Sequence, residues 1–214
     1  NTQRLASMIF HNLRKAEAVP ERNRLRGAYK HTWSRNYTLI SAFLPIAEEL
    51  NTANINYRVL KGVAVQLLTG ILGARVVGDI DIVVPERDLE RTVTVVERHG
   101  FRCSSRAACG FHSVGTFDAA LDFNLGDRHI DLHVAERKEP RRLFRSMLST
   151  PARYATVRET KIALPSAEAL TLHACLHGYR SASQTDFIQA LTDATILQPL
   201  TSRHELNQLA RGTG

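Results

Sequence analysis

The sequence predicts an α/β protein of the α+β type, in which a small mixed sheet is flanked by N-terminal and C-terminal helices. Two stretches alternate as half-buried strands do, 79–84 (DIDIVV) and 129–134 (HIDLHV). Stretches with helical spacing of apolar residues lie before and after them. We therefore expect three parts: an N-terminal helical segment over 1–55, a core over 56–136 and a mostly helical C-terminal segment over 137–214.

The composition is that of a globular protein with a basic surplus. Lys and Arg number 28 against 21 Asp and Glu, a net charge of +7. This surplus suits polyanionic partners such as a nucleoside triphosphate or RNA, and an uneven solvated surface explains it equally well. No apolar run reaches the roughly 18 residues of a membrane span, so we expect no membrane partner. Three cysteines without zinc spacing favour reduced thiols and a cytoplasmic location.

The first part of the chain is expected to form two helices, over 3–18 and over 21–51 with an irregularity at Pro45. The first half of the second helix mixes basic with aromatic residues: Arg22, Arg24, Arg26, Tyr29, Lys30, His31, Trp33, Arg35 and Tyr37. Such a stripe can hold a nucleic acid backbone and stack bases, or dock a partner protein. The alternative is a solvated basic face with the aromatic rings in the core.

A turn at Lys61-Gly62 joins a strand over 56–60 to a helix over 62–72. The free N–H groups and positive dipole end of a helix N-terminus favour phosphate, and Gly62 would let a ligand approach the backbone. Lys61 would add a positive charge; the alternative is a simple turn. Arg75, in the loop that follows, could clamp a triphosphate or pair with Asp79 or Asp81.

Acidic residues mark the two alternating strands. Asp79 and Asp81 share one face of the first strand, where their mutual repulsion is tolerated at an exposed edge or beside a cation. If the second strand lies beside the first, Asp131 completes a cluster of three carboxylates, suited to a hard divalent cation. Asp122 is a spare candidate, because a hairpin at Gly126-Asp127 would bring 119–125 beside 128–135.

The remaining elements are expected as a helix over 86–99, strand-like pieces over 101–105, 113–117 and 153–163, a helix starting near Pro140, and helices beginning at 165–166, 184 and 202. Residues 137–145 form a second basic cluster, which is either a solvated junction or an RNA contact. His173 and His177 are spaced to lie on one helix face. Without a third ligand they indicate packing or hydrogen bonding against the core rather than a zinc site.

Four motifs in order carry a family resemblance: LKG, the Arg before GDIDIVV, IDLH, and LPSAEALTLHACLHG. Together they resemble nucleotidyltransferases of the DNA polymerase β superfamily, and more narrowly an uncharacterised bacterial branch of it. The resemblance covers roughly residues 57–200. The usual signature has Gly-Ser in the first turn, whereas this chain has Gly62 followed by Val63.

The resemblance implies a magnesium-dependent enzyme that moves a nucleoside monophosphate from an NTP, for example ATP, to an acceptor hydroxyl and releases pyrophosphate. Asp79 and Asp81 would hold two Mg²⁺ ions, and Asp131 would ligate the catalytic ion and help deprotonate the acceptor. Lys61, Gly62 and Arg75 would hold the phosphates. The acceptor (tRNA or other RNA, a protein or a small molecule) stays open. Two alternatives also remain: a catalytically silent nucleotide- or RNA-binding module, and a toxin or regulatory partner protein of the same fold.

Overall fold

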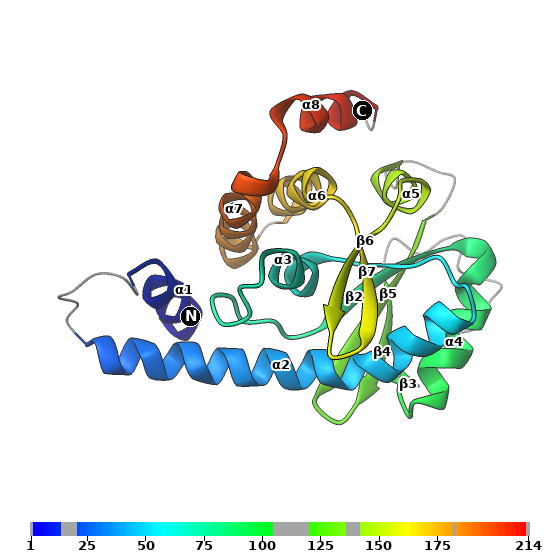
Figure 1. Cartoon of the computed structure of the whole chain (residues 1–214), viewed down its shortest axis with the longest axis horizontal. Helices are drawn as coiled ribbons and strands as arrows, with labels where there is room; N and C mark the ends of the chain where they lie inside the picture. The colour runs from blue at the N-terminus through cyan, green and yellow to red at the C-terminus, as the bar shows by residue number, and fades with distance from the viewer. Residues whose placement is uncertain (1, 14–20, 105–119, 136–141, 182, 213–214) are drawn as a thin grey trace.

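The computed structural model describes residues 2–13, 21–104, 120–135, 142–181 and 183–212. The first helix, α1 (Thr2–Leu13), packs on the long helix α2 (Arg22–Thr52), and Ser7 and Thr32 share a hydrogen bond of 2.8 Å between them (Figure 1). Helix α2 continues through Pro45 as one element. Its first half extends beyond the sheet, and its second half runs beneath it and supplies core residues such as Phe43 and Leu50.

The central sheet has five strands in the order β1-β2-β5-β4-β3. They are β1 (Arg58–Val59), β2 (Ile80–Pro85), β5 (Arg128–Ala135), β4 (Leu121–Leu125) and β3 (Arg102–Cys103). Strands β2 and β5 are parallel and the other neighbours are antiparallel. The expected small mixed sheet with flanking helices is confirmed.

The hairpin expected at Gly126-Asp127 joins β4 to β5, with Gly126 at a φ of 62° that favours glycine. The strand-like stretch over 153–163 forms two strands, β6 (Arg153–Val157) and β7 (Thr160–Leu164), paired as a separate antiparallel hairpin. Its turn contains Arg158 at a φ of 55°. Residues 113–117 and Pro140 lie outside the described residues.

The other elements are helices. They are α3 (Lys61–Thr69), the short η1 (Glu86–Asp88), α4 (Leu89–Arg98), α5 (Arg142–Ser149), α6 (Ala167–Arg180), α7 (Gln184–Leu197), the short η3 (Gln198–Leu200) and α8 (Arg203–Gly212). Helix α6 is capped, as expected, by Ser166, whose side chain accepts a hydrogen bond from the Ala169 N–H. Helix α6 packs closely on α7, and both pack on α3.

Strand β2 separates two apolar clusters. Ile80, Ile82 and Val84 belong to the main core, which includes α2 and α4. Val83 faces the other way, into a smaller cluster with Leu60, Met147 and Ala169 from the start of α3, α5 and α6. Because side chains alternate along a strand, Asp81 lies on the same side as Val83. The acidic face of the sheet is therefore the face toward α5 and α6.

Two further expectations can be compared with the structure. Cys175 is free and exposed, whereas Cys103 is disulfide-bonded, so the expectation of reduced thiols is wrong for Cys103. Among the described helices, none has the length and apolar character needed to cross a membrane. The division of the chain at 55/56 and 136/137 stays a prediction.

Candidate active site

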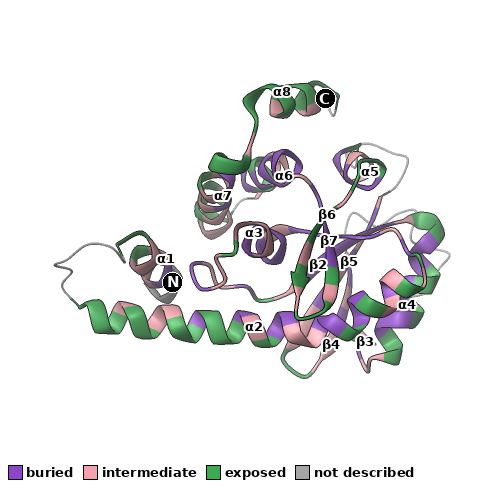
Figure 2. Cartoon of the chain, viewed as in Figure 1, coloured by how far each residue is buried: buried purple, intermediate pink, exposed green. Residues whose placement is uncertain are grey.

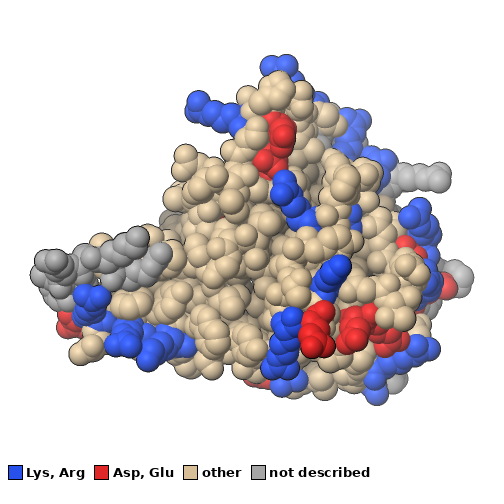
Figure 3. All heavy atoms as spheres, in the orientation of Figure 1, with Lys and Arg blue, Asp and Glu red and all other residues tan. Residues whose placement is uncertain are grey.

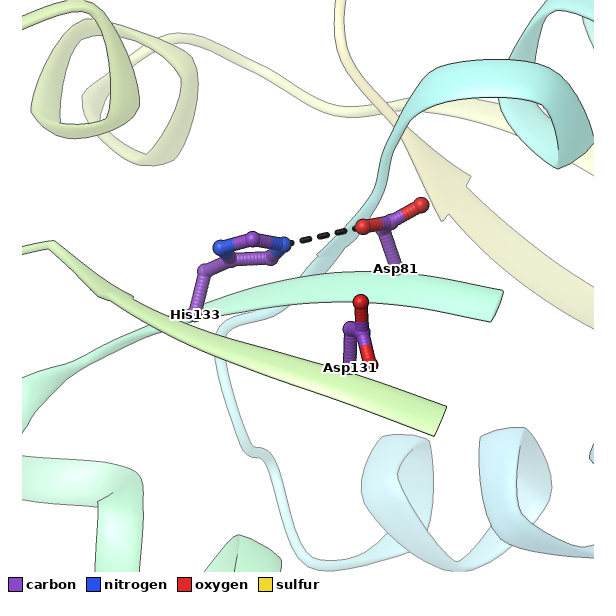
Figure 4. Close-up of side chains that lie close together, drawn as sticks. All are labelled: Asp81, Asp131 and His133. Atoms are coloured by element: carbon purple, nitrogen blue, oxygen red, sulfur yellow. Dashed lines mark hydrogen bonds and ion pairs between the residues drawn. The ribbon is translucent and has the colours of Figure 1, made fainter. Parts of the chain in front are cut away.

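Strand register brings two carboxylates together. In the parallel pair of β2 and β5, Asp81 lies directly opposite Asp131. His133 is two residues further along β5 and therefore on the same face. One ligand atom from each of Asp81, Asp131 and His133 lies within 4.8 Å of the others (Figure 4). Two carboxylates and an imidazole that converge in this way can bind a divalent cation.

Asp81 is the most buried of these groups, with 2% of its side chain exposed. Its Oδ1 accepts a hydrogen bond of 2.9 Å from His133 Nε2 and pairs with the Lys61 ammonium. Burial by itself raises the pKa of Asp81, but the hydrogen bond from His133 and the charge of Lys61 outweigh it and lower the pKa to about 2. Asp81 is therefore ionised and already carries two donors on one oxygen.

Asp79 and Asp131 have the opposite electrostatic environment. Burial, followed by the negative charge of Asp81, raises the pKa of both carboxyls. Asp79 precedes β2 and lines the same cavity, but it lies outside the close set of Asp81, Asp131 and His133. A cation that entered among these carboxylates would relieve their repulsion and favour their ionised forms.

Asp122 lies opposite Asp131 on β4, as its place in the hairpin predicted. It lines the cavity, but its Oδ2 accepts a hydrogen bond of 2.9 Å from Ser104 Oγ, and it also lies outside the close set.

The start of α3 forms one wall of the cavity. Lys61 has a φ of 48°, in the left-handed region that non-glycine residues seldom adopt, and no side chain caps the helix. Gly62 is needed for a reason that the sequence did not reveal: a Cβ there would lie 1.6 Å from Nη1 of Arg75. The guanidinium of Arg75 thus lies against the backbone of Gly62, so two cations flank the uncapped end of α3.

Arg75 is held from two sides. Its Nε pairs with Asp193 Oδ1 of α7 at 2.8 Å, rather than with Asp79 or Asp81. The Gln189 amide, with its oxygen turned toward Arg75, accepts from Nη2 at 2.9 Å. The backbone carbonyl of Arg75 accepts from Asn36 Nδ2 at 2.7 Å and from Gln66 Nε2 at 2.6 Å. These contacts fix the arginine side chain in the cavity.

The cavity has a volume of about 490 Å³ and lies between the acidic face of the sheet, α3, α6 and α7. Helix α6 contributes His173 and His177, which lie 6.1 Å apart between ring centroids. Phe144 of α5 lies between His133 and His173, with centroid distances of 5.5 and 5.6 Å. Burial, followed by the charges of Lys61 and His133, lowers the pKa of His173 to about 3, so this ring is neutral. Of the two histidines, His173 is half-buried and stacks on Phe144, whereas His177 is exposed, so the packing role that the sequence favoured holds for His173.

All six residues singled out in the sequence line this cavity: Lys61, Gly62, Arg75, Asp79, Asp81 and Asp131. Sequence reasoning did not identify the partners that position them, namely Asn36, Gln66, His133, Gln189 and Asp193. For two of these partners, Asn36 and Gln66, the sequence did contain an indication. Asn36 and Gln66 are polar residues at buried positions of otherwise apolar helix faces, and the expected burial of such a residue predicts a specific hydrogen-bonding role.

The fold is that of a nucleotidyltransferase. The chain belongs to a family described as uncharacterised nucleotidyltransferases, whose model matches residues 1–203. No curated protein matches the sequence.

Several solved structures are similar in fold. One is the solution structure of the antibiotic-resistance factor ANT(2'')-Ia, with a TM-score of 0.61 and 14% identity over 82% of this chain and 91% of that chain. Another is an antigenic nucleotidyltransferase-like protein from Paracoccidioides brasiliensis, with a TM-score of 0.54 and 18% identity over 81% and 85%. A third is ANT(2'')-Ia in complex with adenylyl-2''-tobramycin, with a TM-score of 0.53 and 13% identity over 85% and 95%.

Proposed function

We propose that this protein transfers a nucleoside monophosphate from an NTP to an acceptor hydroxyl, with release of pyrophosphate, in a reaction that depends on Mg²⁺. The observation that carries the proposal is the register of β2 and β5, which sets Asp81 opposite Asp131 on the floor of a cavity whose wall is the uncapped end of α3. The carboxylates at the floor would bind the metal ions of a metal-bound triphosphate, and the cations at the wall would bind its phosphates.

The residues present fit a divalent cation. Asp81, Asp131 and His133 offer ligand atoms within 4.8 Å of one another, and Asp79 lines the same cavity as a further oxygen donor. We assign Asp79 and Asp81 to hold two Mg²⁺ ions, with Asp131 as a ligand of the catalytic ion. When bound, Mg²⁺ supplies positive charge that stabilises the phosphoryl oxygens and favours ionisation of the acceptor hydroxyl.

The cations at the wall bind the rest of the donor. Lys61 now pairs with Asp81, and it would exchange that carboxylate for oxygens of the β- and γ-phosphates. Arg75 lies beside the free N–H groups at the start of α3 and would bind the same phosphates while Asp193 holds its Nε. Because Arg75 is already positioned, little ordering is required when the donor binds.

The chemical step joins the acceptor oxygen to the α-phosphorus and breaks the bond from that phosphorus to the oxygen bridging it to the β-phosphate. Asp131 takes the proton of the acceptor hydroxyl, and pyrophosphate leaves with the electron pair of the broken bond. The structure of ANT(2'')-Ia with adenylyl-2''-tobramycin contains a nucleotidylated small molecule. We therefore include small molecules with RNA and protein as acceptors to be tested, and ATP as the first donor.

The test is incubation with each α-³²P-labelled NTP and Mg²⁺, in the presence of total RNA, a protein extract or a small-molecule fraction. The double variant Asp81→Asn/Asp131→Asn removes the cluster's charge with little change of shape. We expect label to move to one acceptor class with the wild type and to fall by at least about 1,000-fold in this variant, as for other losses of a main electrostatic group. Glu86→Gln/Glu90→Gln, with two exposed acids changed, is the matched control and should keep full activity.

Transfer that survives in Asp81→Asn/Asp131→Asn would overturn the proposal. NTP binding by calorimetry that depends on Mg²⁺ but is accompanied by no transfer to any fraction would indicate the silent binding module instead. Neither transfer nor NTP binding would leave a regulatory partner protein with a nucleotidyltransferase fold.

A further inference from the structure

The outward face of the N-terminal half of α2 carries exposed positive charge. Residues 22–47 contain five Arg and Lys residues and no Asp or Glu, so the helix supplies no acidic partner of its own over this stretch. The side chains of Arg22, Arg26, Lys30 and Arg35 are exposed. Figure 2 shows the exposed edge of this half of the helix, and Figure 3 shows Lys and Arg gathered at the same end of the molecule.

Part of this charge forms a line with two aromatic rings. Arg22, Arg26, Lys30, Trp33 and Tyr37 follow one another at spacings of four, four, three and four residues, which places them on one helix face. We call these five residues, together with Arg158, the α2 stripe. From Arg22 to Tyr37 the stripe extends about 22 Å along the helix axis, at about 1.5 Å per residue.

The aromatic end of the stripe is ordered by stacking rather than by burial. Trp33 and Tyr37 stack with their ring centroids 5.1 Å apart and their planes within 6° of each other, and Trp33 is 42% exposed. Arg158, in the turn of the β6–β7 hairpin, donates to the Tyr37 hydroxyl at 3.3 Å and lies 5.8 Å from the centre of its ring. Two distant segments thus hold an exposed indole in one orientation.

A solvated basic helix does not explain this arrangement. Solvation explains exposed lysines and arginines, but it does not require that an exposed indole, stacked on Tyr37, lie in line with them. Tyr29 shows the contrast. It also belongs to the mixed basic and aromatic segment, but it packs inward against Phe10 and against Gly73, where a Cβ would meet its ring. Of the three aromatic residues in the basic half of α2, Tyr29 therefore packs inward, whereas Trp33 and Tyr37 stack on each other.

We propose that the α2 stripe is a docking surface for single-stranded RNA. Cations spaced along a helix bind successive phosphates, and an exposed aromatic ring stacks on an unpaired base. In duplex RNA the bases are stacked and paired, so loops and ends are the RNA segments that offer this combination. The stripe residues do not line the catalytic cavity, and the inference does not depend on the transfer reaction.

The chain contains one tryptophan, so Trp33 reports directly on the proposed contact. The full chain is titrated with a single-stranded RNA of on the order of ten nucleotides, and Trp33 fluorescence and the anisotropy of labelled RNA are followed together. We expect quenching of Trp33 fluorescence on binding. If four cations contact phosphates, the slope of log Kobs against log salt should be about −2.8, at about −0.7 per contact for a single strand.

Variants separate the two parts of the stripe. Arg26→Gln/Lys30→Gln should reduce the salt slope to about −1.4, because two phosphate contacts are lost. Trp33→Ala, followed by anisotropy, should weaken binding by about tenfold or more without changing the slope. Arg203→Gln/Arg211→Gln removes the same charge from the exposed side of α8 and should leave both quantities unchanged. Asp81→Asn/Asp131→Asn should bind RNA as the wild type does, so a failed transferase assay leaves this test intact.

Several results would overturn the proposal. They are the absence of Trp33 quenching at low salt, equal weakening by the Arg203→Gln/Arg211→Gln control, tighter binding of matched single-stranded DNA than of RNA, and equal quenching by duplex RNA. Binding of an acidic polypeptide but not of RNA would assign the surface to a protein partner.

Discussion

The two faces of α2 differ in how their polar groups are used. On the inner face, Asn36 is 1% exposed and makes four hydrogen bonds: to the Leu72 and Arg75 carbonyls at 2.7 Å each, to Gln66 at 3.0 Å, and from the Val77 N–H at 3.2 Å. On the outer face, Arg26 and Lys30 are exposed on a stretch of helix without acids. One helix therefore fixes the loop of Arg75 on one side and leaves its charges accessible on the other.

The difference indicates how this fold separates positioning from recognition. A buried amide with all its partners holds the backbone in one place, as the proposed triphosphate site requires. Exposed cations contribute little to folding, so they can be placed for a ligand at little cost to stability. The α2 stripe can therefore change without affecting the cavity, whereas a change at Asn36 alters both stability and the site.

The largest effect that tests this comparison is expected from Asn36→Leu. The change leaves buried N–H and carbonyl groups of the 72–77 loop without partners, and should lower the free energy of unfolding by about 4 kcal/mol, at about 1–3 kcal/mol for each unsatisfied group. Asn23→Leu, at an exposed position of the same helix, should change it by less than about 0.5 kcal/mol. Urea unfolding of both variants measures the difference, and similar losses for both would contradict the asymmetry.

Alternation and periodicity in the sequence were enough to predict much of this arrangement. The spacing of apolar residues predicted α2, β2 and β5. The alternation in DIDIVV and IDLH placed the carboxylates on one face of each strand. The resemblance supplied the adjacency of β2 and β5. The turn of the β6–β7 hairpin was missed because Arg158 and Glu159 provide neither of the Gly or Asn residues that mark such turns.

Long-range polar pairs were beyond prediction. Arg75 had two plausible acidic partners nearby in the sequence, yet it pairs with Asp193, whose position depends on how α7 packs on α3. The sequence also did not indicate why residue 62 is a glycine. The group that excludes a Cβ there is the guanidinium of Arg75, which belongs to a different loop. The roles of Asp79, Asp81 and Asp131 as metal ligands stay predictions.

Gly62→Ala should have the next largest effect, and on catalysis more than on stability. A methyl group at this position would lie 1.6 Å from Nη1 and 2.6 Å from Cζ of Arg75. Because a long arginine side chain can swing aside, the protein should fold while Arg75 leaves its place beside the start of α3. We expect kcat/KM for the NTP to fall by about 100-fold, the loss typical of a misplaced group. Unchanged NTP kinetics would show that Arg75 does not contact the donor.

Lowering the pH should show how much the buried charge of Asp81 contributes to stability. Its folded pKa of about 2 lies below the ordinary 3.8, so its ionisation stabilises the fold above pH 3.8, and that contribution is lost as pH falls through about 2. Ionised Asp81 contributes about 2 kcal/mol to the free energy of unfolding, and about 1 kcal/mol of this should be lost between about pH 5 and pH 3. Asp79 and Asp131 have raised pKa values, so their protonation at low pH favours the folded state, opposite to the effect of Asp81.

The comparison that isolates Asp81 is between the wild type and Asp81→Asn, unfolded in urea at both pH values. The wild type should lose about 1 kcal/mol more than the variant, and carboxyl ¹³C shifts should titrate Asp81 below Asp131. Equal acid sensitivity of the two proteins would mean that Lys61 and His133 do not hold the Asp81 carboxylate. The residues of the α2 stripe do not line the cavity that contains Asp81, so their variants should follow the wild type.

The smallest effect concerns Gly27, on the half of α2 that carries the stripe. A Cβ at this position meets nothing within 4 Å, and its φ is not positive, so the glycine has no structural requirement there. Gly27→Ala should raise the free energy of unfolding by about 0.5–1 kcal/mol, because alanine loses less backbone entropy in a helix, and should leave RNA binding unchanged. The same change at Gly62 impairs the site, because there the space beside the glycine is occupied. A loss of stability in Gly27→Ala, measured by urea unfolding, would show that another part of the protein covers this face of α2 in solution, and the face could not then be open to a ligand.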